Sequence, residues 1–281
     1  MKLASYVAGG KPLFGAVVGD GVVTLNDKLG GKYADLREAL AGGALEEMKK
    51  AAAGAKPDHK LSEITFLPVI REPKKILCVG INYKSHAAES GYEAPALPNI
   101  FTRFVDTLTS HEGEQVKPKA SNTYDFEGEL ALIIGKPGRA ISRNDALSYV
   151  AGYTCFCDGS ARDFTKFSLV ASKNFPRTGP LGPWMVTTDE IPDPSKLVLK
   201  TRLNGQEMQK SGTDMLIHDI PAIIEFCSKW APLSAGDIIA TGTPDGIGGK
   251  RNPPVWMKGG DLLEVEISGI GTLRSHIVDE K

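Results

Sequence analysis

Two glutamates separated by one residue lie at the start of an apolar segment, residues 124–135. In a β-strand, positions two apart point to the same face, so Glu127 and Glu129 would share one. Two carboxylates on one face repel each other unless a cation or protons lie between them. Taken alone, a Glu-x-Glu pair is more typical of a solvated strand face than of a site.

A third carboxylate changes that interpretation. Asp158 ends a second apolar run, residues 148–158, directly before a turn-like segment, where an anionic side chain is well placed to meet Glu127 and Glu129. Three carboxylates would form an oxygen-rich site suited to Mg²⁺ or Mn²⁺, with water or substrate as further ligands. No histidine cluster suggests zinc. Arg162, close behind Asp158, is expected either to pair with Asp163 or to brace the site.

The elements that must position these residues are mainly strands. Further strand-like runs lie at 196–203, 237–241 and 262–267, and the convincing helices after residue 70 are near 84–90, 143–150 and 217–230. The regular alternation of strand and helix that builds a doubly wound sheet is missing. The 31 glycines fall mostly at turns between strands. Together these features predict an α+β, β-rich fold with a barrel or roll.

The first 70 residues are expected to form a small α+β module, and residues 71–281 the larger domain. Residues 13–25 predict two strands joined by a hairpin at Gly19-Asp20-Gly21. Residues 34–54 are rich in Ala, Leu, Glu and Lys and predict helix, with a weak point at Gly42-Gly43.

Composition excludes several classes of function. Thirty-three Lys and Arg against 34 Asp and Glu give a formal charge of −1, so the concentrated basic surface of a nucleic-acid binder is not expected. No apolar run reaches transmembrane length, and the N-terminal segment lacks a signal-peptide core. Four cysteines without CxxC spacing predict buried free thiols in a reducing cytoplasm.

Two motif-like segments are also rejected. Gly80-Ile-Asn follows a strand but lacks the GxGxxG pattern of a dinucleotide site. Residues 241–250 superficially resemble a phosphate loop, but Arg251 follows Lys250 where such a loop needs Ser or Thr.

Six short segments, at 79–89, 125–131, 153–163, 180–184, 204–209 and 236–244, occur in the order found in the fumarylacetoacetate hydrolase family. The chain resembles the smaller bacterial members of that family, which carry a short N-terminal module. This resemblance implies a mixed β-roll catalytic domain, a homodimer, and a Mg²⁺ or Mn²⁺ cofactor. It also implies that Glu127, Glu129 and Asp158 are the metal ligands.

His86 and Glu89 are three residues apart in an expected helix and therefore share a face. A carboxylate beside an imidazole orients it and raises its basicity. From the sequence alone, such a pair is more readily explained as a surface ion pair. The family resemblance implies instead that it activates a water. Because the helix follows a glycine-containing turn, it is also a candidate lid.

Other residues are assigned by the resemblance. Lys173 matches a family lysine, where an ammonium would stabilise an oxyanion or enolate. Gln209 and Thr243 match positions that contact the metal's water or the substrate carboxylate; ordinary turn hydrogen bonds are the equal alternative. Tyr83 and Arg103 are expected near the pocket entrance, where Arg103 would hold a second substrate carboxylate bidentately.

The resulting hypothesis is a metal-dependent hydrolase that cleaves a carbon–carbon bond in an acylpyruvate- or fumarylpyruvate-type diketo acid, a small α-keto acid. The alternative is a decarboxylase or isomerase of an oxo-dicarboxylate in aromatic catabolism. A third, remote alternative is a catalytically silent metal-binding oligomer. Thr165, Asn174, Pro176 and Arg177 depart from the family's usual residues, so no single relative's substrate carries over.

Overall fold

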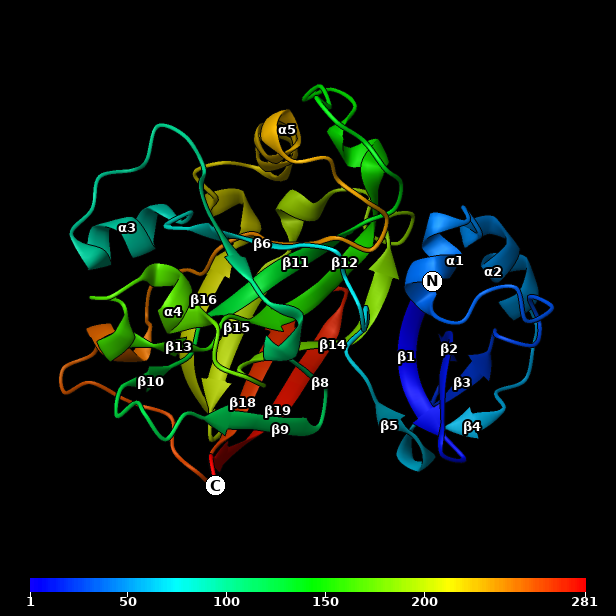
Figure 1. The fold of residues 1–281 in the computed structure, drawn as a ribbon, viewed down its shortest axis with the longest axis horizontal. Helices are drawn as coiled ribbons and strands as arrows, with labels where there is room; N and C mark the ends of the chain where they lie inside the picture. Colours follow the sequence, from blue (N-terminus) through cyan, green and yellow to red (C-terminus); the bar gives the residue numbers. More distant parts are fainter.

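The computed structural model of the chain describes all 281 residues and is built on two large sheets (Figure 1). The larger sheet has 12 strands in the order β4-β3-β2-β1-β14-β12-β11-β17-β6-β7, with β5 beside β1 and β8 beside β14. Beyond the N-terminal module its strands are β6 (Ile76–Gly80), β7 (Asn99–Arg103), β8 (Leu108–Ser110), β11 (Gly128–Ile134), β12 (Val150–Cys157), β14 (Gly179–Thr187) and β17 (Ile238–Ala240).

The second sheet has five strands in the order β16-β15-β18-β19-β9. Its strands are β9 (Gly113–Lys117), β15 (Val198–Leu203), β16 (Gln206–Gly212), β18 (Leu262–Ile267) and β19 (Gly271–Asp279). A short ladder pairs β10 (Tyr124–Asp125) with β13 (Ser160–Ala161). The helices outside the module are α3 (Lys84–Ser90), α4 (Leu169–Lys173) and α5 (Ile220–Trp230).

Strand β11 is buried along its whole length because both of its faces meet a hydrophobic core. Leu130, Leu132 and Ile134 belong to a core shared with the five-stranded sheet. Ala131 and Ile133 belong to a second core on the other face. An unbroken apolar run is the pattern expected of a strand covered on both sides. The acidic residues at its beginning are therefore held at the end of a rigid, water-free element.

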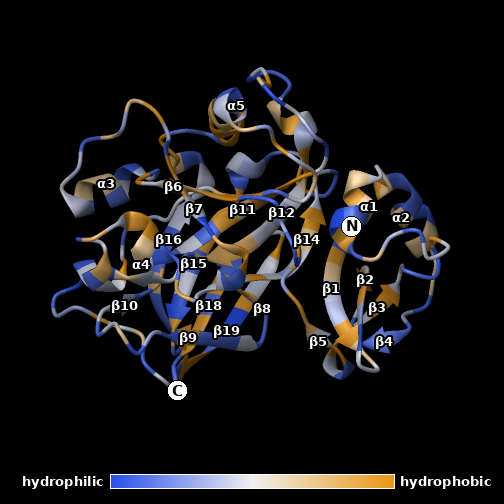
Figure 2. Ribbon diagram, in the orientation of Figure 1, coloured by the Kyte–Doolittle hydropathy of each residue, from blue (hydrophilic) through white to orange (hydrophobic).

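The N-terminal module shares its core with the rest of the chain. It contains β1 (Lys2–Ala8), β2 (Lys11–Val18), β3 (Gly21–Thr24), β4 (His59–Lys60), β5 (Thr65–Phe66), α1 (Leu36–Ala41) and α2 (Leu45–Ala52). Strand β1 pairs with β14, and Leu3 lies in the same cluster as Phe156 and Met185 of the larger domain. Figure 2 shows hydrophobic segments where β1 faces β14. The expected boundary near residue 70 falls between β5 and β6, within one continuous sheet.

The expected β-rich α+β fold is confirmed, and most expected elements appear. The hairpin between β2 and β3 turns at Gly19, where φ is +59°. The helical stretch 34–54 breaks at Gly42-Gly43 into α1 and α2. The four cysteines are free and buried. No helix has the length and apolarity needed to cross a membrane.

The helix expected near residues 143–150 is wrong. The chain forms only a 3₁₀ turn at Ala146–Tyr149 and then enters β12. The Tyr149 carbonyl accepts a hydrogen bond of 2.7 Å from the Gly135 amide, and Val150 pairs with Ile134. Sheet pairing with a distant strand therefore overrides the local helical preference.

Because the two parts share a core, we expect them to unfold together. Leu3→Ala should lower the free energy of unfolding by about 2–5 kcal/mol. The loss should appear equally in far-UV circular dichroism and in tryptophan fluorescence, since all three tryptophans lie outside the module. Val18→Ala, which truncates a half-exposed side chain of the module, is the control. A Leu3→Ala shift confined to circular dichroism would show that the module unfolds on its own.

Candidate metal centre and active site

Three buried carboxylates converge where β11 and β12 pair. Glu127 immediately precedes β11, Glu129 is the second residue of that strand, and Asp158 directly follows β12. The strand register sets Gly128 opposite Cys157, and the Asp158 amide donates to the Glu127 carbonyl at 2.9 Å. Each side chain offers one oxygen, and these oxygens lie within 4.8 Å of one another. The structure therefore brings the three predicted ligands together.

Gly128 allows the two glutamates to lie this deep. A Cβ at this position would lie 2.0 Å from Thr201 Oγ1 and 3.3 Å from Val265 Cγ1 of the second sheet. A side chain here would force Thr201 or the beginning of β11 to move. The glycine between the two acidic residues is thus required by close packing rather than by flexibility.

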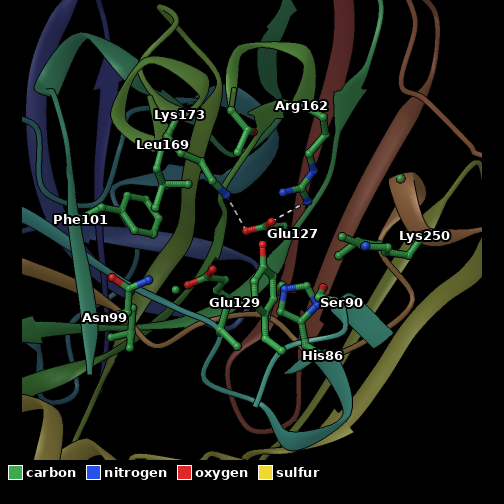
Figure 3. Close-up of a pocket in the computed structure, with 18 of the residues that line it drawn as sticks. His86, Ser90, Asn99, Phe101, Glu127, Glu129, Arg162, Leu169, Lys173 and Lys250 are labelled. Carbon is green, nitrogen blue, oxygen red and sulfur yellow. Dashed lines mark hydrogen bonds and ion pairs between the residues drawn. The ribbon is translucent and has the colours of Figure 1, made fainter. Parts of the chain in front are cut away.

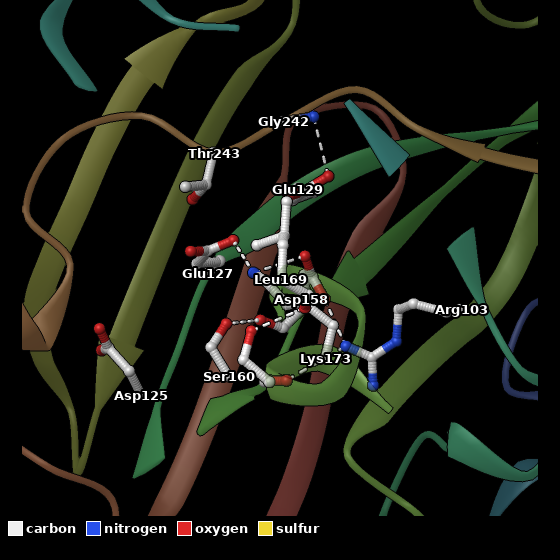
Figure 4. Close-up of polar contacts among 12 residues, drawn as sticks. Arg103, Asp125, Glu127, Glu129, Asp158, Ser160, Leu169, Lys173, Gly242 and Thr243 are labelled. Atoms are coloured by element: carbon white, nitrogen blue, oxygen red, sulfur yellow. Dashed lines mark hydrogen bonds and ion pairs between the residues drawn. The ribbon is translucent and has the colours of Figure 1, made fainter. Parts of the chain in front are cut away.

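Three cations neutralise two of the carboxylates: Lys173 and Arg103, which Figure 4 shows, and Arg162, which Figure 3 shows. Lys173 Nζ lies 2.7 Å from Glu127 Oε2 and 2.7 Å from Asp158 Oδ2. Arg162 donates to Glu127 Oε1 at 2.6 Å, and Arg103 pairs with Asp158. Burial by itself would raise the pKa of Glu127, but Lys173 and Arg162 outweigh it and hold that pKa at about 2. Glu127 is therefore ionised at any physiological pH.

Glu129 has no cationic partner. Its carboxylate is 2 % exposed and accepts one protein hydrogen bond, from the Gly242 amide to Oε2 at 2.8 Å. Burial and the neighbouring charges of Asp158 and Glu127 raise the pKa of Glu129 well above its usual value. A divalent cation among the three carboxylates would supply the missing charge. An all-carboxylate donor set fits Mg²⁺ or Mn²⁺, and Glu127, Glu129 and Asp158 would hold it.

A cavity of about 560 Å³ opens over Glu127 and Glu129, whereas Asp158 is fully buried (Figure 3). Its charged and polar lining includes His86, Glu127, Glu129, Arg162, Lys173, Thr243 and Lys250. Its apolar lining includes Phe101, Leu169, Ile247 and Trp256. A polar floor with apolar walls is typical of a site for a small, charged organic molecule.

His86 and Glu89 lie on one face of α3, as the sequence predicts, and His86 faces the cavity. His86 Nδ1 is 3.5 Å from Glu89 Oε2, and neither atom has a hydrogen-bond partner although both are buried. Each is thus the other's nearest available partner. The Gly246 amide donates to Glu89 Oε1 at 2.9 Å and fixes the carboxylate. Glu89 is therefore placed to orient the His86 ring.

The beginning of α3 is tied to the segment that binds Glu129. Asn82 is fully buried and donates to the carbonyls of Thr241 and His218 at 2.8 and 3.0 Å. Gly242, the residue after Thr241, binds Glu129. The histidine helix and the metal centre are thus connected through one short stretch of backbone.

Lys173 differs from the solvated loop lysine that its sequence context alone would suggest. It is the last residue of the short helix α4 and is 2 % exposed. Its ammonium also lies 5.4 Å from the centre of the Phe101 ring. Two of its three N–H donors are used by Glu127 and Asp158, so in this structure it holds two predicted ligands together. Its predicted role towards an oxyanion or enolate stays a prediction.

Arg103 and Tyr83 do not lie at a pocket entrance, contrary to expectation. Arg103 is buried and uses four of its five N–H donors on Thr107, Asp158, the Gly159 carbonyl and Thr178, so its guanidinium is not accessible to a second substrate carboxylate. It acts on Asp158 instead.

Tyr83 is also fully buried, at the beginning of α3. Its hydroxyl has no hydrogen-bond partner, and burial raises its pKa. Tyr83 and Arg103 are therefore both buried, and neither lines the cavity.

Gln209 and Thr243 bind each other and the backbone. Gln209 Nε2 donates to Thr243 Oγ1 at 2.8 Å, and its Oε1 accepts from the Gly128 amide at 3.0 Å. Thr243 Oγ1 donates to the Gly128 carbonyl at 2.9 Å. The pair thus supports Gly128, between the two glutamates. Thr243 also lines the cavity, and the contact of either residue with substrate stays a prediction.

The sequence analysis missed the role of Asp125. This fully buried carboxylate accepts from Arg162 Nε at 2.8 Å, and Arg162 also binds Glu127. Arg162 therefore braces the site and does not pair with Asp163, which binds Ser121. The available signal was the alternation of acidic residues at 125, 127 and 129 on one run.

Comparison with known proteins agrees with this geometry. Residues 75–278 match the fumarylacetoacetate (FAA) hydrolase C-terminal family, and the chain belongs to this family. It is 36% identical over 266 residues to a rat protein named oxaloacetate tautomerase Fahd2a, mitochondrial, covering 93% of this chain and 85% of that protein. It is 41% identical over 226 residues to oxaloacetate tautomerase YisK of Bacillus subtilis, covering 78% of this chain and 75% of that protein.

The fold is also similar to a solved structure of maleylpyruvate hydrolase from Sphingobium sp. SYK-6 in complex with manganese(II) and pyruvate. The TM-score is 0.84 with 28% sequence identity, and each chain is covered completely. This likeness places a manganese-containing relative on the same fold.

Glu129→Gln should separate metal binding from folding. The change removes one ligand charge, so Mn²⁺ affinity measured by titration calorimetry should fall at least about tenfold. Glu207→Gln, an exposed glutamate on β16, is the matched control and should not alter affinity. An unchanged Mn²⁺ affinity for Glu129→Gln would contradict the ligand assignment.

The metal-free protein should lose stability as the pH rises. Because the pKa of Glu129 is raised by folding, the folded protein binds the extra proton between the usual carboxyl pKa and the raised one. The associated stabilisation is complete at low pH and is lost as pH rises through the raised pKa. Thermal melts in chelator should show this decline, Glu129→Gln should flatten it, and saturating Mn²⁺ should reverse it. Equal slopes for the two metal-free proteins would contradict the assignment of the shift to Glu129.

Proposed function

We propose that the protein is a divalent-metal enzyme that interconverts the keto and enol forms of a small 2-oxo acid, with oxaloacetate as the best candidate. The observation that carries the proposal is that His86, with Glu89 beside it, lines one cavity together with Glu127 and Glu129 of the three-carboxylate cluster. Relatives at 36% and 41% identity are named oxaloacetate tautomerases, which supports this choice of reaction.

The metal would act as a Lewis acid on the carboxylate and 2-oxo group of the substrate and so acidify the adjacent C–H bond. His86 would then accept the C3 proton, while the C–H electron pair forms the C2–C3 double bond. Glu89 stabilises the imidazolium that results. The proton returns to the 2-oxo oxygen, which gives the enol with no net gain or loss of atoms.

The residues around the carboxylates would support this reaction in two ways. Lys173 and Arg162 fix the carboxylates, so their positions need not change when charge develops on the substrate. Phe101, Leu169 and Trp256 would limit the access of water to the reacting carbon.

Hydrolysis of a carbon–carbon bond in an acylpyruvate-type diketo acid is the second candidate. The same His86–Glu89 pair would deprotonate a water for attack on the distal carbonyl. The fold shared with maleylpyruvate hydrolase favours this possibility. Decarboxylation of an oxo-dicarboxylate passes through a similar enolate and requires no activated water.

A panel of reactions distinguishes these candidates. Purified protein with Mg²⁺ or Mn²⁺ should be assayed for oxaloacetate keto–enol exchange, for oxaloacetate decarboxylation, and for cleavage of acetylpyruvate and fumarylpyruvate. The proposal expects catalysed exchange to exceed the other three rates. Faster diketo-acid cleavage would replace tautomerisation with hydrolysis, and no activity with any of them would refute both.

His86→Ala should lower kcat for tautomerisation by about 10²–10⁴-fold, because it removes the acid–base group. Glu89→Gln should lower kcat less and shift the pH–rate profile, because it changes the basicity of His86 without removing it. Neither change should alter Mn²⁺ affinity, measured by calorimetry. A His86→Ala enzyme with wild-type kcat would assign the proton transfer to another group.

A further inference from the structure

Lys250 is the unpaired cation of the cavity. Among the lysines and arginines that line it, Lys173 and Arg162 are paired with carboxylates, whereas Lys250 makes no ion pair. Its side chain is exposed to solvent, and Figure 3 shows it on the side of the carboxylates opposite Phe101 and Asn99. Its charge is therefore available to a ligand.

The turn that carries Lys250 is fixed to the metal centre. Lys250 ends a 3₁₀ turn, Gly248–Lys250. The amides of Gly248 and Gly249 donate to the Asp125 carboxylate at 2.8 and 3.1 Å. Asp125 also binds Arg162, which binds Glu127. These amides serve a protein carboxylate and not a phosphate, which also explains why the segment only resembles a phosphate loop.

Close packing keeps this turn in place. A Cβ on Gly248 would lie 2.0 Å from the Val255 carbonyl oxygen and 2.6 Å from Asp125 Oδ1. A Cβ on Gly249 would lie 3.0 Å from the Trp256 ring. Two glycines therefore let the backbone pack against Asp125, and Lys250 supplies the first side chain that extends from the turn.

We propose that Lys250 binds the distal carboxylate of a dicarboxylic 2-oxo acid and so selects dicarboxylates over monocarboxylates. This inference rests on the proposed function, because the 2-oxo carboxylate end is taken to bind at the metal centre. Arg103, the residue expected to bind a second carboxylate, is buried and hydrogen-bonded within the protein interior. A flexible ammonium at the cavity wall suits a carboxylate at the far end of a short chain.

Two unreactive ligands isolate this contact. Oxamate presents only the 2-oxo carboxylate end, whereas N-oxalylglycine adds a distal carboxylate. Calorimetry with Mg²⁺-loaded protein should show that Lys250→Gln weakens N-oxalylglycine binding about fivefold, the size expected for one exposed charge-assisted contact. Oxamate binding should stay unchanged. Lys250→Arg should restore most of the N-oxalylglycine affinity, and Lys210→Gln, an exposed unpaired lysine on β16, is the control.

The outcomes separate the two proposals. Equal effects of Lys250→Gln on both ligands, or no effect on either, would overturn the role of Lys250 and leave the proposed reaction standing. A selective effect in a protein without tautomerase activity would retain Lys250 and overturn the reaction. Wild-type protein that binds neither ligand in Mg²⁺ or Mn²⁺ would overturn both. With oxaloacetate as substrate, Lys250→Gln should raise KM about fivefold at constant kcat.

Discussion

The repulsion among three carboxylates buried within 4.8 Å of one another is the constraint on which this structure depends. Water cannot screen these charges, so the protein must supply the opposing ones. Lys173 comes from α4, Arg162 from the turn after β13, and Arg103 from the end of β7. The ionic network therefore ties together segments that are distant in sequence. Glu127 and Asp158 each have two cationic partners, so removing any one of these cations weakens the network and leaves one partner in place.

The negative charge of Glu129 is not balanced by a cation. Glu127 and Asp158 each meet at least one cation, whereas Glu129 receives only the Gly242 amide. The unbalanced charge is therefore localised on the carboxylate that belongs to the rigid strand β11. A cation that binds beside Glu129 would meet carboxylates that are already fixed in position. Its binding would therefore require little reorganisation. The same backbone stretch leads from Gly242 to Asn82 at the start of α3, and so fixes the His86 helix relative to Glu129.

The sequence predicts those parts of the molecule that depend on neighbouring residues. Glu127 and Glu129 are linked by strand periodicity, His86 and Glu89 by helix periodicity, and the Gly19 turn by backbone conformation. The sequence does not predict contacts between residues that are far apart along the chain. Arg103 and Asp158 are 55 residues apart, and Arg162 and Asp125 are 37 apart. An arginine beside a predicted pocket is therefore assigned equally well to substrate or to a buried acid, and only the fold distinguishes them. The prediction of a helix near residues 143–150, before β12, is wrong for the same reason.

This arrangement holds the carboxylate cluster and the cavity wall at Lys250 by different contacts. Glu127 and Asp158 are held in the ionic network, where a substitution disturbs several partners at once. The turn at 248–250 is held through its backbone, because Asp125 accepts from two main-chain amides. The side chain at position 250 can therefore change without loosening Asp125, Arg162 or Glu127. A charge at the cavity wall can thus be altered independently of the metal centre. Loops attached to a fixed scaffold in this way allow one catalytic centre to serve several substrates.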